Sequence, residues 1–408
     1  MDGTDPTLPR LLFPVAQRAL QKTPVLVITG ARQVGKSTLA QQLGGGRTYL
    51  SLDDIDTLER AQREPDSLLD TGKPVTLDEV QRVPSLLLAV KRAVDSRRRA
   101  GRFVLTGSAN LHLMRTVSET LAGRALYLTL TPMTRREVLG LGTAGAWNAL
   151  FESKDVDWPD LLAASRAPRE DWRQLALRGG YPTPAHELDS PEARRSWFAG
   201  YTQTYLERDL RELSSISSLV DFRRLMRAAS LRVGNMISQT ELGRDVGLPQ
   251  PTVRRHLNLM EVSYLLTSLP TYAVNKTKRI IKAPKLYWND PGLALFLAGE
   301  TEPRGAHLEN LVLADLLAWQ GAALDQTDVM YWRTTTGEEV DFVIERGGEL
   351  LPIEVKATRR PRLEDTRSLQ LFRQEYRQKT RAALLLHDGD QTTWLADGVL
   401  AAPWWRVV

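Results

Sequence analysis

The sequence contains no cysteine, and this absence excludes several classes of protein at once. A chain without thiols has no disulfide framework, no cysteine nucleophile and no thiolate zinc site. It also lacks any apolar run of about 18 residues, so we expect no membrane-spanning helix and no membrane partner. The N-terminal segment, which includes Asp2 and Asp5, lacks the basic, apolar and small-residue order of a signal peptide. These absences predict a cytoplasmic protein.

Length and charge set broad limits on what the chain can be. Its 408 residues are enough for roughly two to four domains. With 42% apolar and 25% charged residues, the composition is that of a globular protein. The 54 basic and 49 acidic side chains leave a formal charge of +5. This small excess fits a polyanionic partner and an arginine-rich solvated surface equally well, so the position of the positive charge matters more than its sum.

Strands and helices alternate in the first third of the chain. Short apolar runs predict strands at 25–28, 49–52, 75–77 and 103–106, with helical patterns between them. Such an alternation predicts an α/β fold with a parallel sheet that is covered by helices on both faces. Residues 133–215 then show mostly helical spacing.

A glycine-rich loop follows the first predicted strand and precedes a predicted helix. The pattern G-x-x-x-x-G-K-[ST] is met by Gly30, Ala31, Arg32, Gln33, Val34, Gly35, Lys36 and Ser37, with Thr38 next in the helix. Glycines let successive backbone N–H groups face phosphates, and the helix N-terminus adds a partial positive charge. We expect Lys36 to reach the β- and γ-phosphates of ATP and Ser37 to bind Mg²⁺. The alternative is a chance match, which the flanking strand and helix argue against.

Two adjacent carboxylates follow the third predicted strand. We expect Asp78 to hold Mg²⁺ through water and Glu79 to orient or deprotonate the attacking water. An acidic pair after a strand is otherwise typical of a solvated strand end, and the glycine loop upstream is what favours catalysis here.

Three further side chains are candidates for the same site. Thr106 or Ser108, at the end of the fourth strand, is positioned to sense the γ-phosphate, unless the strand simply ends in a turn. Arg124 follows a short helical motif and is a candidate arginine finger for a neighbouring subunit. The alternative for Arg124 is a surface or helix-capping role.

At this point the sequence resembles a known family, the prokaryotic AAA+ ATPases with a DUF4143 C-terminal region. The resemblance lies in motifs at 30–38, 77–81, 105–108, 121–124, 179–182, 205–210 and 339–342. It covers nearly the whole chain, and the order of the motifs is specific. The resemblance implies a AAA+ core, a helical lid, a winged-helix-like middle and a restriction-endonuclease-like end. We therefore expect domains at 1–132, 133–215, 216–304 and 305–408.

The middle region has the spacing of a helix-turn-helix around Gly247. Its second helix carries basic and polar groups that suit phosphates and base edges, with His256 expected on the helix surface. The candidate DNA-binding residues are Arg254 and Arg255 in this helix and Lys276, Lys278 and Arg279 in a basic wing. The alternative is a packing module that joins the ATPase to its neighbour.

Near the C-terminus, Asp341 ends one predicted strand and Glu354-Val355-Lys356 ends the next. This is the D…E-x-K arrangement of PD-(D/E)xK nucleases, in which two carboxylates hold a divalent ion and a lysine positions the water. Alternation along the strand puts Glu354 and Lys356 on one face, and Glu309 can add a carboxylate from the preceding helix. The alternatives are a fold kept for dimerisation, or for DNA binding without cleavage.

These motifs support more than one function. The leading hypothesis is an ATP-driven enzyme that remodels or translocates DNA as a ring oligomer, for which we expect a hexamer. A second is a nucleotide-controlled regulatory switch without motor activity, and a third is an ATP-gated, metal-dependent nuclease.

Overall fold

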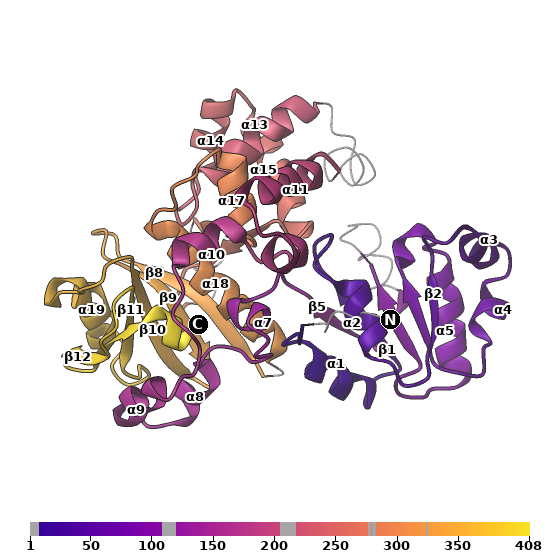
Figure 1. The fold of residues 1–408 in the computed structure, drawn as a ribbon, viewed down its shortest axis with the longest axis horizontal. Coiled ribbons are helices and arrows are strands. Elements are labelled where there is room, and N and C mark those ends of the chain that lie inside the picture. The colour runs from indigo at the N-terminus through magenta and orange to yellow at the C-terminus, as the bar shows by residue number, and fades with distance from the viewer. Residues whose placement is uncertain (1–7, 108–119, 205–217, 276–278, 280–282, 324) are drawn as a thin grey trace.

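The computed structural model describes residues 8–107, 120–204, 218–275, 279, 283–323 and 325–408. Ser108, Lys276, Lys278 and the motif at 205–210 lie outside these residues. In Figure 1 an α/β body from the N-terminal third lies beside a second sheet from the C-terminal third, and a helical body from the middle of the chain lies above both.

The N-terminal body is a parallel sheet of order β2-β3-β4-β1-β5. Its strands are β1 (Val25–Thr29), β2 (Thr48–Ser51), β3 (Val75–Asp78), β4 (Phe103–Thr106) and β5 (Ala125–Thr129). The first four confirm the strands expected from the apolar runs. The sequence analysis missed β5, which forms one edge of the sheet and is only partly buried.

Helices connect these strands and cover the sheet, as the alternating pattern predicts. They are α1 (Phe13–Leu20), α2 (Lys36–Gln42), α3 (Ile55–Arg63), α4 (Pro65–Leu69) and α5 (Leu86–Ser96). The carboxyl ends of β1, β3 and β4 meet at one edge, because parallel strands all point the same way. Ligands bind at this edge in open α/β sheets.

The segment after β5 first contacts the C-terminal sheet. It contains α7 (Arg135–Val138), α8 (Trp147–Glu152) and α9 (Trp158–Ala163). The Arg381 Nε donates to Asp155 at 2.9 Å, and the Ala382 amide donates to the same carboxylate at 2.6 Å. Trp147 Nε1 donates to Asp315 at 2.5 Å. These contacts hold α8 and α9 against the C-terminal body, below it in Figure 1.

The helical body follows in the chain. It contains α10 (Trp172–Arg178), a π-helical turn (Thr183–Glu187), α11 (Pro191–Thr204), α13 (Leu219–Ser230), α14 (Gln239–Val246), α15 (Gln250–Val262) and α17 (Pro291–Ala298). Strands β6 (Leu266–Leu269) and β7 (Lys285–Trp288) pair antiparallel. Gly247 has φ +70° between α14 and α15, a left-handed conformation that suits glycine. His256 is 3% exposed and packs on Phe222, so the expectation of a surface histidine was wrong.

The C-terminal body is a mixed sheet of order β12-β13-β11-β10-β9-β8. Its elements are α18 (Gly305–Ala322), β8 (Thr327–Arg333), β9 (Glu339–Arg346), β10 (Glu349–Lys356), α19 (Arg367–Glu375), β11 (Ala383–His387), β12 (Thr393–Ala396), β13 (Val399–Pro403) and α20 (Trp404–Val407). This confirms the predicted order of helix, three strands, helix and strand. The sequence analysis missed β12 and β13.

One apolar core joins these bodies. It runs from Ile28 under the first sheet, through Phe198 and Phe222 in the helical body, to Ile353 and Leu384 in the C-terminal sheet. Packed apolar side chains therefore connect the three bodies. Across the described residues, every helix is too short or too polar to cross a bilayer. The expected domain boundaries remain a prediction.

Candidate active site

The glycine loop has the strained backbone that its sequence requires. Gly30 has φ +144° at the end of β1, and a Cβ there would lie 2.2 Å from the Leu130 carbonyl oxygen, so only glycine fits. Gly35 has φ +94° and forms the N-cap of α2. Gln33, between them, has φ +59°, which is rare for a residue other than glycine. The loop therefore turns sharply into the N-terminus of α2, where backbone N–H groups are free of intrahelical partners.

Lys36 lies under this loop and is almost fully buried. Its Nζ donates to the carbonyl oxygens of Ala31 at 2.7 Å and Gly30 at 3.3 Å. These bonds hold the Lys36 ammonium beside the glycine loop, which the sequence motif predicts to bind phosphates.

The Asp78 carboxylate accepts hydrogen bonds from several hydroxyl groups at the carboxyl edge of the sheet. Ser37 Oγ donates to its Oδ1 at 2.9 Å, and Tyr49 OH donates to its Oδ2 at 2.7 Å. Thr106 also donates to Asp78 and accepts the Glu79 amide at 3.2 Å. Burial and the Asp78 carboxylate both raise the pKa of Tyr49, so its hydroxyl stays protonated as a donor. The structure thus brings Ser37, Asp78 and Thr106 together and adds Tyr49, which sequence reasoning missed.

Glu79 stands next to this cluster in an unusual backbone conformation. Its φ of +58° and ψ of +44° are left-handed, which costs an ordinary residue of order 1–3 kcal/mol. Its carboxylate accepts from the Gln81 amide, and its backbone N–H is held by Thr106. Glu79 thus follows directly after Asp78, the last residue of β3.

Arg124 has a partner within its own chain. Its guanidinium donates to both oxygens of Asp95, at 2.6 and 3.0 Å. This pair is partly exposed. Its role as a finger for a neighbouring subunit remains a prediction.

Arg10 forms a hydrogen bond with the backbone of the glycine loop. This residue was not predicted from the sequence. Its NH1 donates to the Val34 carbonyl at 2.7 Å, and its NH2 donates to the Thr131 carbonyl at 2.6 Å. Its Nε donates to Glu137 at 3.1 Å, and both side chains are buried. The only sequence signal was a single arginine within an otherwise apolar segment.

Replacing Arg10 with alanine is expected to weaken both folding and nucleotide binding. The Arg10→Ala variant leaves the buried Glu137 carboxylate without its ion-pair partner, which costs about 3–5 kcal/mol in the free energy of unfolding. It also leaves the loop carbonyl of Val34 without a donor. Urea unfolding measures the first effect and ATP titration the second. Arg18→Ala, an exposed arginine in α1, is the matched control and should leave both unchanged.

One hydrogen bond connects the residue before the glycine loop to the helical body, and a second lies within that body. Tyr264, which follows α15 and has φ +58°, donates from its hydroxyl to Thr29 at 3.0 Å. Asp290, the N-cap of α17, accepts the Gly180 amide at 2.6 Å. Burial raises the pKa of Asp290 to about 6, while its backbone donors hold the pKa down. The residue directly before the loop is therefore bonded to the helical body.

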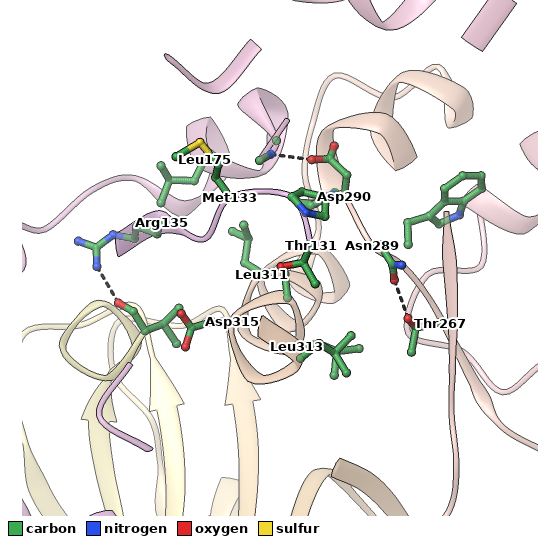
Figure 2. A pocket seen from close by; sticks show the side chains of 18 of the residues that line it. Thr131, Met133, Arg135, Leu175, Thr267, Asn289, Asp290, Leu311, Leu313 and Asp315 are labelled. Carbon is green, nitrogen blue, oxygen red and sulfur yellow. Dashed lines mark hydrogen bonds between the residues drawn. The ribbon is translucent and has the colours of Figure 1, made fainter. Parts of the chain in front are cut away.

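A cavity of about 300 Å³ marks the junction of these bodies (Figure 2). Its walls come from the loop after β5, the end of α10, the ends of β6 and β7, α18 and the C-terminal residues. Three polar side chains at its edge have partners: Asn289 accepts from Thr267 at 2.6 Å, Asp290 accepts from Gly180, and Arg135 donates to the Val408 oxygen at 2.8 Å. A smaller cavity of about 240 Å³ lies beside Gly35 and Thr38.

A second cluster of carboxylates lies in the C-terminal body, as the sequence predicted for Glu309, Asp341 and Glu354. Burial, followed by the Asp341 charge, raises the pKa of Glu309 to about 7 and that of Glu354 to about 8. Lys356 donates to Glu354 at 2.5 Å. The cluster also contains Lys285, from β7, which sequence reasoning missed because it belongs to a different part of the chain.

The basic residues expected to bind DNA differ in their surroundings. Arg254 and Arg255 are exposed on α15, and the part of the chain that is described offers neither an ion-pair partner. Arg279 is mostly buried instead, and its NH1 donates to Glu345 at 2.7 Å. It also lies over the Tyr272 ring at 4.8 Å, so its charge is already engaged. Arg279 is therefore not an exposed wing cation as expected.

Comparison with known proteins assigns family models to three parts of the chain. Residues 22–139 match an AAA domain, 169–304 match the domain of unknown function DUF8612, and 304–407 match the domain of unknown function DUF4143. Among solved structures, 70% of the chain covers 94% of a Walker-type ATPase of Pyrococcus abyssi, at 15% identity and a TM-score of 0.43. Similarly, 64% of it covers 93% of AMPPCP-bound DnaA from Aquifex aeolicus, at 14% identity and a TM-score of 0.31.

Two curated relatives match over almost the entire chain. The uncharacterized proteins Rv2008c of Mycobacterium tuberculosis and Mb2031c of Mycobacterium bovis are each 30% identical over 397 residues, which is 95% of this chain and 81% of theirs. The matched AAA domain contains the glycine loop and both acidic residues after β3. On this evidence the chain belongs to the family of AAA-type ATPases with a DUF4143 region.

Proposed function

We propose that this chain hydrolyses ATP at the glycine loop with Mg²⁺ and uses the hydrolysis to remodel or translocate DNA that its middle region binds. The observation that carries the ATPase part is the 2.9 Å bond between Ser37 and Asp78, with the Lys36 ammonium under the same loop. A hydroxyl and a carboxylate beside an ammonium are the groups that bind a metal-phosphate complex. The residues present therefore fit Mg²⁺ and a triphosphate.

Each side chain has one role in this proposal. Lys36 would leave the loop carbonyls to contact the phosphates, and Ser37 and Asp78 would hold Mg²⁺, which would supply positive charge there. Glu79 accepts the proton of the attacking water. Thr106 fixes the Asp78 carboxylate and the backbone of Glu79, since it donates to the first and accepts the N–H of the second. The cavity beside Gly35 and Thr38 has room for the base.

The DNA part of the proposal rests on α14 and α15. These helices are joined by a glycine turn and followed by the paired strands β6 and β7, which is the order of a winged helix. Arg254 and Arg255 project from α15 without carboxylate partners among the described side chains. Unpaired arginines on such a helix are suited to phosphate contacts.

Removing these two arginines is expected to weaken DNA binding and its dependence on salt. The logarithm of the DNA association constant falls linearly with the logarithm of the salt concentration, because roughly one counterion is released per phosphate contact. In Arg254→Ala/Arg255→Ala the magnitude of this slope should decrease by about 2, one for each arginine removed. Fluorescence anisotropy on duplex DNA at several salt concentrations measures both quantities.

The matched control removes the same charge elsewhere. Arg60 and Arg63 are exposed on α3, so Arg60→Ala/Arg63→Ala has the same net charge as the test variant. The control should bind DNA as wild type does. Equal DNA affinity in wild type and in the α15 variant would mean that the middle region is a packing module.

A nucleotide-controlled switch is the second candidate, and one contact favours it. The Tyr264 hydroxyl reaches Thr29, the residue before the loop, so a change in the loop can move the end of α15. A motor predicts ATP turnover that rises with duplex, forked or junction DNA. A switch predicts slow turnover that DNA does not change, together with nucleotide-dependent DNA affinity.

The proposal extends to assembly and to the C-terminal sheet. In a ring oligomer, Arg124 would release Asp95 and contact the ATP phosphate bound by the neighbouring subunit. The mass of the oligomer, measured with and without ATP, tests whether such a ring forms. We propose a lid role for the segment that follows α10, because Pro182, His186 and Glu187 line the cavity beside Gly35. We also propose a restriction-endonuclease-like fold for the C-terminal body. The support is the order of α18, β8, β9 and β10 and the approach of Glu309, Asp341 and Glu354.

A further inference from the structure

A buried ammonium occupies the centre of the carboxylate cluster in the C-terminal body. Lys285 is 2% exposed, and its Nζ lies 2.5 Å from Glu339, 3.1 Å from Glu309 and 3.3 Å from Asp341. These carboxylates come from α18 and β9, whereas Lys285 comes from β7 of the helical body. A single cation from β7 thus bridges acidic groups from two other elements, α18 and β9.

The charges explain why this arrangement is stable. A buried ammonium is costly unless carboxylates surround it, and buried carboxylates have the same need. Burial alone would lower the pKa of Lys285, but Glu309, Asp341 and Glu339 outweigh it and raise the pKa above its ordinary value. Lys285 therefore stays charged.

Further hydrogen bonds engage three carboxylates of this cluster. Asp341 Oδ2 accepts the Val355 amide at 2.9 Å, and Glu309 accepts the Tyr287 hydroxyl. One oxygen of Glu354 binds Lys356, and the other is buried without a hydrogen-bond partner among the described residues. Within the described ranges, the His, Asp and Glu side chains form no group of three arranged for a metal ion. The residues therefore do not fit the divalent ion expected from the D…E-x-K pattern.

We propose that the Lys285 ammonium is the resident cation of this cluster and takes the place of the divalent metal, so that the C-terminal body does not cleave DNA. The ammonium satisfies the carboxylates that would otherwise require a metal. It also fastens the helical body to the C-terminal sheet, because β7 and β9 lie on either side of it. This inference is independent of ATP hydrolysis at the glycine loop.

The full chain, without nucleotide, tests this with Mn²⁺ as the probe. Wild type and Asp341→Asn should give the same Mn²⁺ titration, because Asp341 has no metal to lose. Neither should cut duplex DNA in Mn²⁺. A wild-type Mn²⁺ site or nuclease activity that disappears in Asp341→Asn would overturn the proposal. The glycine-loop site is the same in both proteins and cancels in the comparison.

Removing the ammonium is the complementary experiment. Lys285→Met keeps the length and apolar part of the side chain, and it should gain a Mn²⁺ site that is lost again in Lys285→Met/Asp341→Asn. A folded Lys285→Met protein with no added Mn²⁺ affinity would contradict the proposal. If this variant does not fold, the comparison of wild type with Asp341→Asn decides alone.

Discussion

The Glu79→Gln variant is expected to bind ATP with Mg²⁺ as wild type does and to hydrolyse it roughly 10²- to 10⁴-fold more slowly. Glutamine has the size of glutamate, and its side-chain oxygen can still accept from Gln81, so the site keeps its shape. The amide cannot take a proton from water, however, and this is the one function that the substitution removes. Phosphate release measures turnover, and titration with a fluorescent ATP analogue measures affinity.

The control for this variant is a glutamate outside the site. Glu64 is exposed between α3 and α4, and Glu64→Gln should hydrolyse ATP at the wild-type rate. Equal turnover in wild type and Glu79→Gln would show that another group activates the water. A loss of affinity in Glu79→Gln would instead indicate that the left-handed backbone at this position depends on the carboxylate.

The nucleotide site could be predicted because its signals are local. The glycines at 30 and 35 are required by the backbone at their own positions, where φ is positive. Strands β1, β3 and β4 are fully buried, so their sequences are mostly apolar. Parallel pairing then brings their carboxyl ends together, which places Asp78, the last residue of β3, at the same edge as the glycine loop. Strand β5 was missed because an edge strand that is only partly buried leaves a weaker pattern.

The residues that sequence reasoning missed act across long stretches of chain. Arg10 binds Glu137, which is 127 positions away, and no periodicity relates the two. Tyr264 reaches Thr29 from 235 positions away. The packing of separate elements determines which of these residues meet. A single sequence carries no local pattern that reveals this packing. A lone charged residue in an apolar segment, as at Arg10, was the only available signal.

The C-terminal cluster contains residues that local sequence patterns could place and one residue that they could not. Asp341 and Glu354 could be placed together because neighbouring antiparallel strands carry them in one sheet. Lys285 could not, because it lies in a strand that pairs with β6 in the helical body. Its proximity to Asp341 depends on how the two bodies dock, and that contact changes the chemistry expected of the cluster from metal binding to an internal ion pair.

The Lys36→Ala variant is expected to lose ATP binding itself, which separates it from Glu79→Gln. A charge-assisted contact to phosphate is worth up to about 3 kcal/mol, so affinity should fall by roughly 100-fold, with turnover lost at ordinary ATP concentrations. The loop should keep its glycine-determined backbone, because Gly30 and Gly35 are unchanged.

The matched control for Lys36 is Lys73, which is exposed ahead of β3 at the opposite end of the sheet. Lys73→Ala removes the same charge and should bind ATP as wild type does, since electrostatic interaction between exposed groups that far apart is screened. If Lys36→Ala and Lys73→Ala bind ATP equally well, the loop does not hold the phosphates. The roles assigned to Ser37 and Asp78 would then fail with it, because both depend on phosphates being placed beside the Lys36 ammonium.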